Sequence, residues 1–270
     1  MLFAHGLSSL GFSKNHAEIK DAVTYDYIIA TGPYQEKALK LAAEKYKVRL
    51  PEIIRGGFIR GDTLAEKGRA FNRRAFLKKC GLPDRKTLLF APTWGEFSAT
   101  AEWIDPIAEA SHELDCNLLI KLHPLMLEGT TQWETAGIDW KAKLAQLGSR
   151  KNIHICNTYE LEDYMLAADI MITDASSVGI EFFLLRRPVI FLPAPQYFDT
   201  FGRDKPIYWL REGLEISEIS GLKEKIKAIN PDSGPAADYD LESIIYNPGN
   251  AVANICSFLR NIGGQRPADG

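Results

Sequence analysis

The sequence has few cysteines and no long apolar run, and each shortage argues against a class of protein. Its four cysteines, Cys80, Cys116, Cys156 and Cys256, lie far apart and show no paired spacing. This pattern argues against a zinc-binding framework or a disulfide-rich fold, and favours a reducing cytosol. No run approaches the ~18 apolar residues that a membrane span needs, and residues 1–10 lack the basic leader of a signal peptide. We therefore expect a cytoplasmic protein.

What the sequence does contain is enough apolar material for a sizeable core. The chain has 270 residues, of which 46% are hydrophobic and 10% aromatic, so it can form one large domain or two smaller ones. Its net charge of −3 is unevenly spread, because residues 55–86 hold ten Lys or Arg against three Asp or Glu. Such a segment is either the solvated face of a linking helix or a surface for an acidic substrate or an anionic lipid layer. The second reading leaves open a peripheral position at the inner face of the plasma membrane.

Residues 167–193 form the segment around which the rest of the chain is organised. An apolar run at 170–172 predicts a strand, a small polar cluster at 173–177 predicts a turn, and apolar residues at helical spacing lead to a second strand at 189–192. Unpaired backbone N–H groups and the dipole at the start of a helix favour an anion. The segment therefore predicts a phosphate site between a strand and a helix.

Polar side chains in this segment predict how a nucleotide is held. Ser176 and Ser177 add hydroxyl donors at the helix start, and Glu181 lies further along the helix, where a carboxylate accepts from ribose hydroxyls. The turn then reads as a pyrophosphate and ribose site. The alternative is that Asp174, Ser176 or Ser177 caps an ordinary helix, which is a common use of these residue types.

Strands alternate with helices along the whole chain, and most strands are apolar throughout. This pattern predicts parallel sheets covered on both faces, with ligands bound beyond the carboxyl ends of the strands. Three short strands, near residues 1–4, 25–30 and 53–55, are too few for a complete first domain. The strand at residues 87–91 starts a second domain. Seven polar or aromatic residues follow predicted strands: His5, Thr93, Trp94, His123, Asp174, Ser176 and Ser177.

We expect three segments along the chain. Residues 1–80 form a partial, acceptor-side Rossmann-like domain with a basic linker helix, residues 81–235 form a nucleotide-donor-binding Rossmann-like domain, and residues 236–270 hold a C-terminal helix and a disordered tail. The last helix is expected to pack back on the first domain. Four further local predictions are a glycine-rich loop at 56–62, one basic helix at 63–80, an aromatic-rich loop at 196–209 and a helix at 218–229.

Six short motifs, in order, resemble the CDP-glycerol glycerophosphotransferase family of teichoic-acid and capsule polymerases. The motifs are His5-Gly6, Tyr-Ile-Ile-Ala-Thr-Gly-Pro at 27–33, Gly-Phe-Ile-Arg-Gly-Asp at 57–62, Ala-Pro-Thr-Trp at 91–94, Ile-Lys-Leu-His-Pro at 120–124, and residues 169–188. Each motif is weak alone, whereas their order and spacing make the set fairly specific. The resemblance implies a GT-B-like α/β fold with two Rossmann-type parallel-sheet domains, of which the first is abridged here.

The resemblance also implies a reaction and roles for residues. It implies a cell-envelope transferase that moves glycerol phosphate, or a similar polyol phosphate, from a CDP-activated donor to a hydroxyl of a polyol-phosphate or glycan acceptor, without cofactor or metal. His5 would be the base, because a histidine tuned near neutral pH can accept the hydroxyl proton. The implied donor-side residues are Thr93, Trp94, Lys121, His123, Asp174, Ser176, Ser177 and Glu181. Lys14, Arg60 and Asp62 would lie on the acceptor side or in its loop.

The sequence departs from the family pattern at several positions, and two alternatives stay open. Gly95 replaces a basic residue of the family pattern, Ala175 replaces a tyrosine and Glu181 replaces an aspartate. The chain also starts almost at His5, and this suggests an abridged protein or a homo-oligomer that shares strands. The first alternative is another GT-B activity, a UDP-N-acetylglucosamine 2-epimerase of the non-hydrolysing type or a glycosyltransferase. The second is an inactive, truncated nucleotide-binding fragment. No nucleic-acid partner is expected.

Overall fold

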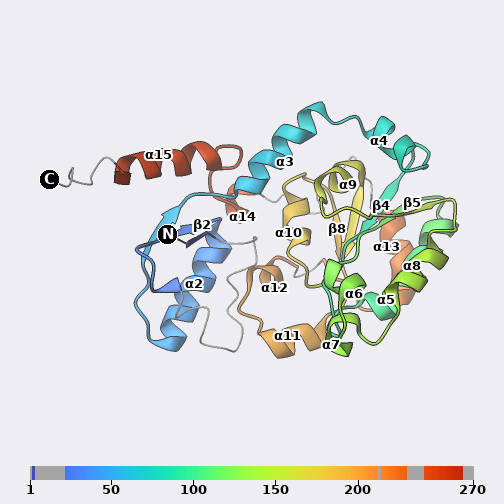
Figure 1. Ribbon diagram of the computed structural model, residues 1–270, viewed down its shortest axis with the longest axis horizontal. Coiled ribbons are helices and arrows are strands. Elements are labelled where there is room, and N and C mark those ends of the chain that lie inside the picture. The colour runs from blue at the N-terminus through green and yellow to red at the C-terminus, as the bar shows by residue number, and fades with distance from the viewer. Residues whose placement is uncertain (1, 4–21, 212–213, 230–239, 264–270) are drawn as a thin grey trace. The chain divides into compact units, whose positions relative to one another are not determined.

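The computed structural model describes residues 2–3, 22–211, 214–229 and 240–263, and shows an α/β protein with two parallel sheets (Figure 1). The chain divides into two compact units. The first unit comprises Met1–Arg69, Phe201–Pro206 and Tyr239–Gly270, and the second comprises Ala70–Thr200 and Ile207–Asp238. The predicted α/β class with two parallel-sheet domains is thereby confirmed. No helix in the ranges described here is long and apolar enough to cross a membrane.

The first unit is built on a small sheet with the strand order β1-β2-β3. Its elements are β1 (Leu2–Phe3), β2 (Tyr27–Ala30), α2 (Pro33–Tyr46), β3 (Glu52–Arg55), α3 (Ile59–Ala70), α14 (Leu241–Ile244) and α15 (Ala251–Gly263). Its core joins β2 to α2, since Ile28 packs with Leu39 and Ala42, three apolar residues that are almost inaccessible to solvent. Within the described residues this sheet has three strands, the number that the sequence predicts.

The C-terminal segment of the chain packs on the carboxyl edge of this first sheet. The Tyr246 N–H donates to the Thr31 carbonyl at 2.8 Å, just beyond the end of β2. The Asn254 side chain donates to the Arg55 carbonyl at 3.0 Å, and the Phe258 ring lies edge-on to Tyr27 at 5.1 Å. The last helix therefore packs on the first unit, as the sequence predicts.

A buried carboxylate joins this C-terminal segment to α2. Glu36 accepts from the Tyr246 hydroxyl at 2.6 Å, from Arg55 Nε at 3.0 Å and from Lys40 Nζ at 2.6 Å. The hydrogen bond from Arg55 is the largest of the effects that lower the pKa of Glu36 to about 2, and burial opposes them. Burial, followed by the bond to Glu36, raises the pKa of Tyr246 to about 12.

These two shifted pKa values predict a pH dependence of stability. Because the pKa of Glu36 is lowered on folding, its contribution is present above its unfolded pKa of 4.5 and is lost as the pH falls towards 2. The tyrosine contribution has the opposite sign, so it is lost as the pH rises from 10 towards 12. We expect Tyr246→Phe to lower the free energy of unfolding of the first unit by about 1–2 kcal/mol at pH 7 and to flatten its loss at acid pH. Urea unfolding at several pH values tests this. Parallel acid profiles of the two proteins would contradict it.

The second unit is built on a larger sheet with the strand order β6-β5-β4-β7-β8. Its strands are β4 (Thr87–Phe90), β5 (Asn117–Ile120), β6 (Ile153–Ile155), β7 (Ile170–Thr173) and β8 (Val189–Phe191). Its helices are α4 (Arg73–Lys79), α5 (Thr100–Glu113), α6 (Pro124–Glu128), α7 (Gln132–Thr135), α8 (Trp140–Leu147), α9 (Glu162–Ala167), α10 (Val178–Phe183), α11 (Pro195–Phe201), α12 (Pro206–Leu210), the short 3-10 turn η1 (Ile219–Gly221) and α13 (Leu222–Ala228). All residues of the three central strands β5, β4 and β7 are buried, which explains their continuous apolar sequences.

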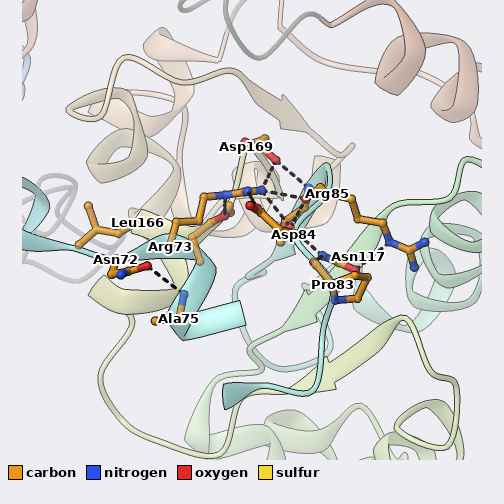
Figure 2. Close-up of polar contacts among 12 residues, drawn as sticks. Asn72, Arg73, Ala75, Pro83, Asp84, Arg85, Asn117, Leu166 and Asp169 are labelled. Carbon is orange, nitrogen blue, oxygen red and sulfur yellow. Dashed lines mark hydrogen bonds and ion pairs between the residues drawn. The ribbon is translucent and has the colours of Figure 1, made fainter. Parts of the chain in front are cut away.

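Two arginines of the basic segment, Arg73 and Arg85, form hydrogen bonds inside the second unit, at the amino edge of its sheet. Figure 2 shows Arg73 pointing toward Asp169 and Asp84. Its Nη2 donates to Asp169 at 2.8 Å and its Nε to the Ala167 carbonyl at 2.9 Å. Arg85 in turn donates to Asn117 at 3.0 Å. These two cations hold strand starts together, whereas contact of the remaining basic residues with a lipid surface stays a prediction.

Four local predictions need correction. The predicted basic helix at 63–80 is two helices, α3 and α4, because the Asn72 side chain accepts from the Ala75 N–H at 2.9 Å and starts a new helix. The predicted loop at 56–62 is a loop only over residues 56–58, since α3 begins at Ile59. The predicted aromatic loop at 196–209 contains α11 and α12, and the predicted helix at 218–229 begins with η1.

Candidate functional site

The carboxyl edge of the second sheet brings together most of the predicted donor-side residues. Thr93 and Trp94 follow β4, Lys121 and His123 follow β5, and Asp174 follows β7. Because β4 lies between β5 and β7 in the sheet, these residues come from three adjacent strands. In open parallel sheets this edge is where ligands bind. The edge is therefore the candidate functional site of the second unit.

Asp174 is fully buried and joins the end of β7 to the loop after β4. Its Oδ1 accepts from the Thr93 N–H at 2.6 Å, and its Oδ2 accepts from the Ser98 hydroxyl and the Ala99 N–H, each at 3.0 Å. Burial raises the pKa of this carboxyl group, and the three donors oppose that rise. Asp174 does not cap α10, since its recorded partners are all in the loop after β4.

A buried arginine lies behind this carboxylate, and the sequence analysis missed it. Arg211 is 1% exposed, lies over the rings of Phe191 and Phe198, and donates through Nη2 to the Leu192 carbonyl. Burial lowers its pKa, while Glu215 and Asp174 act in the opposite direction. Its Nε forms an ion pair with the Glu215 carboxylate at 2.5 Å, so Glu215 is the direct partner of this buried charge. An arginine that follows the apolar run of α12 was the available signal in the sequence.

His123 is held in a defined orientation at the start of α6. It is the N-cap residue, and its Nδ1 accepts from the Leu125 N–H at 3.2 Å. Partial desolvation by neighbouring protein atoms and the nearby Lys121 lower the pKa of the ring, which favours the neutral imidazole at pH 7. A neutral imidazole that accepts at Nδ1 carries its proton on Nε2. His123 therefore offers a neutral Nε2–H donor from an exposed side chain.

Aromatic rings surround His123 on the side of the β4 loop. Trp94 lies 5.9 Å from the His123 ring at 33°, and 4.5 Å from Trp133 at 81°. Trp133 is 43% exposed, and the Glu96 N–H donates to its carbonyl at 3.1 Å. Gly95 has φ of +81°, and a Cβ there would lie 2.6 Å from the same carbonyl. The glycine that departs from the family pattern is thus required by this close approach. Trp133 was not predicted.

A small cavity of about 80 Å³ lies beside Lys121, beyond the ends of β5 and β6. Its lining includes Lys121, Cys156, Asn157, Thr158 and Tyr159. Burial lowers the pKa of Lys121, whose Nζ donates to the Leu122 carbonyl at 3.2 Å. Burial raises the pKa of the Cys156 thiol well above its usual value. The lining offers a cation, an amide, a hydroxyl and an aromatic ring, which together suit a small polar ring.

The predicted turn at the start of α10 is present, with two half-buried serines. Ser177 is the N-cap residue of this helix, but its side chain makes no capping hydrogen bond. Among the described residues neither the Ser176 nor the Ser177 hydroxyl has a recorded hydrogen bond, so both can donate to a ligand. Glu181 lies in α10 and is only 4% exposed, and its contact with a ribose stays a prediction.

The acceptor-side predictions fall mostly on other parts of the chain. His5 and Lys14 lie outside the described residues. Arg60 is exposed on α3, in the first unit. Asp62 is half-buried, and its Oδ2 accepts from the Val252 N–H at the start of α15 at 3.0 Å. In this structure Asp62 therefore attaches the last helix to α3, and the predicted acceptor roles stay predictions.

Comparisons with known proteins agree with these observations. A family model described as CDP-glycerol:poly(glycerophosphate) glycerophosphotransferase matches residues 4–204. The teichoic acid poly(glycerol phosphate) polymerase of Bacillus spizizenii is 26% identical over 185 residues, which cover 64% of this chain and 42% of that protein. The teichoic acid glycerol-phosphate primase of Bacillus subtilis is 26% identical over 216 residues, which cover 71% of this chain and 48% of the primase. The chain thus spans about half the length of the curated relatives it matches.

A solved structure with the same fold adds the architecture. A variant of the wall teichoic acid polymerase TagF, soaked with CDPG, superposes with a TM-score of 0.61 at 21% identity, over 91% of this chain and 58% of that chain. At this identity the likeness establishes the fold, and it confirms the GT-B-like class expected from the sequence. Because the family model covers residues 4–204 of a chain of 270, this protein belongs to the CDP-glycerol:poly(glycerophosphate) glycerophosphotransferase family.

Proposed function

We propose that this chain transfers a polyol phosphate, glycerol phosphate or a close relative, from a CDP-activated donor to a hydroxyl of a cell-surface polymer or its precursor. Family membership supports the reaction class. One observation supports the donor side: His123, with its Nε2–H donor, lies at the same edge of the second sheet as the Ser176 and Ser177 hydroxyls, which form no hydrogen bond with any residue that the structure describes. Neutral and backbone donors of this kind stabilise charge that develops on a phosphate.

In the proposed reaction the oxygen of the acceptor hydroxyl attacks the phosphorus that carries the polyol. A new phosphorus–oxygen bond forms, the bond to the bridging oxygen of the pyrophosphate breaks, and CMP leaves with that oxygen and its negative charge. His5 would take the hydroxyl proton, a role that the family resemblance implies for it. His123 and the two serines would donate to the pyrophosphate oxygens, where negative charge increases as CMP leaves.

The contacts at the same edge suggest where the rest of the donor lies. The cavity beside Lys121 and Tyr159 is lined by groups that suit a pyrimidine ring, since an amide and a hydroxyl can pair with its polar edge. Trp94, whose ring lies 5.9 Å from the His123 ring, and its neighbour Trp133 form an aromatic wall beside His123. We therefore place the base beyond β5 and β6, and the pyrophosphate between His123 and the serine turn.

Calorimetric titration with CDP-glycerol, CDP-ribitol and UDP-N-acetylglucosamine tests this function. We expect one CDP-polyol to bind most tightly, and the double variant Ser176→Ala, Ser177→Ala to lose at least about tenfold in affinity, because two hydrogen bonds to a charged phosphate are removed. Ser149→Ala is the matched control, since Ser149 lies before β6 and donates to the Gln146 carbonyl at 2.7 Å. Preference for the UDP-sugar would point to an epimerase or a sugar transferase instead. Absence of binding by the unsubstituted chain would overturn the proposal.

A further inference from the structure

Two aspartates tie strand β7 to strand β4, one at each end. Asp169 lies just before β7 and accepts from the N–H of Thr87, the first residue of β4, at 2.7 Å. Asp174 lies directly after β7 and accepts from the Thr93 N–H, just past the end of β4, at 2.6 Å. The two carboxylates thus make matching contacts at opposite edges of the same strand pair.

The two carboxylates differ in what else they hold. Asp169 also accepts from Arg73, in the cluster at the amino edge of the sheet (Figure 2). Asp174 instead reaches Ser98 and Ala99, at the far end of the loop that starts after β4. Its contacts therefore close residues 93–99 into a ring around one carboxylate. Residues 93–99 form neither a helix nor a strand, so their shape depends on contacts with other parts of the chain, of which the carboxylate supplies three.

Asp174 has no surface with which to touch a ligand. The residue is 0% exposed, and both of its carboxylate oxygens accept hydrogen bonds from protein groups. All three of its recorded partners are donors, which favours the ionised form. A buried carboxylate that accepts three hydrogen bonds next to a candidate site indicates a role in shaping that site.

The loop that Asp174 closes carries the rings that line the candidate donor site. Trp94 lies one residue after Thr93 and packs against the His123 ring at 5.9 Å. The next two residues attach the loop to α7, through Gly95 and through the Glu96 N–H, which donates to the Trp133 carbonyl at 3.1 Å. A change in the path of residues 93–99 would therefore move Trp94 and Trp133 relative to His123.

We infer that Asp174 is a positioning residue for donor binding, which acts by fixing the loop at residues 93–99 and does not contact the donor. This inference rests on the function proposed above. It separates Asp174 from Ser176 and Ser177, which lie two and three residues further on and whose hydroxyls bond to no described residue.

Asp174→Asn and Asp169→Asn form a matched pair that tests this. Each change replaces one carboxylate oxygen by an amide nitrogen that cannot accept from a backbone N–H. We expect Asp174→Asn to raise the Kd for CDP-glycerol at least about tenfold, since charge-assisted hydrogen bonds are lost. CMP release at saturating donor should change by less than about threefold. Asp169→Asn should lower thermal stability while changing the Kd less than twofold.

Hydrogen exchange of the ligand-free proteins gives a second readout that needs no donor. Asp174→Asn should speed exchange of the Thr93 and Ala99 amides, whereas Asp169→Asn should speed exchange of the Thr87 amide. Equal weakening of donor binding by both variants would overturn the inference, and so would an unchanged Kd for Asp174→Asn. If Asp174→Asn does not fold, Ser98→Ala, which removes one of the three donors, should still raise the Kd by a smaller factor, and an unchanged Kd there would overturn it.

The same measurements test the proposed function and the positioning role of Asp174 separately. Failure of the unsubstituted chain to bind CDP-glycerol would overturn the proposed function. The exchange comparison would then decide by itself whether Asp174 holds the loop, because it depends only on the hydrogen bonds of the free protein. Slow exchange at Thr93 and Ala99 in Asp174→Asn would contradict the positioning role whatever the ligand.

Discussion

Replacing His123 by asparagine should lower kcat/KM for the CDP-activated substrate by about 100-fold, the effect of removing one hydrogen-bond donor to a developing negative charge. The stability of the second unit should stay unchanged. The two effects differ because the two ring nitrogens make different contacts. Nδ1 accepts from the Leu125 N–H at the start of α6. Asparagine is a favourable N-cap and can replace this contact with its own oxygen. It cannot replace the Nε2–H donor.

His123→Gln provides the complementary variant. The longer glutamine side chain can present an N–H near the position of Nε2, but glutamine is not among the favoured N-cap residues. We expect this variant to retain more activity than His123→Asn and to lose about 0.5–1 kcal/mol of stability. Steady-state kinetics and thermal unfolding of both variants measure the two effects separately. Turnover within threefold of the parent in His123→Asn would show that Nε2 contributes nothing to the reaction.

Replacing Gly32 by alanine should lower the free energy of unfolding of the first unit by about 3 kcal/mol, the upper range of overpacking effects. Gly32 has φ of −172°, an extended conformation that any residue adopts, so the backbone itself is not strained. The added Cβ, however, would lie 2.0 Å from the Ile244 carbonyl oxygen and 2.9 Å from the Ile245 Cα. These are backbone atoms at the end of α14 and directly after it, and they cannot move aside as a flexible side chain can.

The clash would separate the C-terminal segment from the first sheet. A shift of Ile244 and Ile245 would break the 2.8 Å bond from the Tyr246 N–H to Thr31 and the 2.6 Å bond from its hydroxyl to Glu36. Gly221→Ala is the control, because nothing lies within 4 Å of its added Cβ. Urea unfolding should show a lower midpoint for Gly32→Ala and less than about 0.5 kcal/mol of change for Gly221→Ala. Equal stability of the two variants would contradict the close approach.

Much of the fold followed from the sequence because the strands carry a clear signal. The strands β4, β5 and β7 are buried on both faces and read as continuous apolar runs, so the parallel-sheet class could be predicted. Helix ends were harder, since they depend on single side chains. The start of α4 depends on one hydrogen bond, which the Ala75 N–H donates to the Asn72 side chain. Both residues lie within a stretch whose sequence predicts a single helix.

The position of the candidate site also followed from the sequence, because polar residues directly after strands of a parallel sheet must gather at one edge. Thr93, His123, Ser176 and Ser177 do lie at that edge of the second sheet. Their partners could not be predicted. Trp133 enters the site only because α7 returns to the loop after β4, where Glu96 binds its carbonyl.

The sequence by itself determined which residues stand at the ends of strands and which family they resemble. Only the tertiary structure decided what each of them does there. Asp174 and Ser176 are two residues apart and belong to the same polar turn, yet Asp174 is buried and accepts three hydrogen bonds, whereas the Ser176 hydroxyl bonds to no described residue. The difference arises because Asp174 meets backbone donors 75 and 81 residues away along the chain. Contacts across such separations depend on how strands and loops pack, which no local pattern specifies.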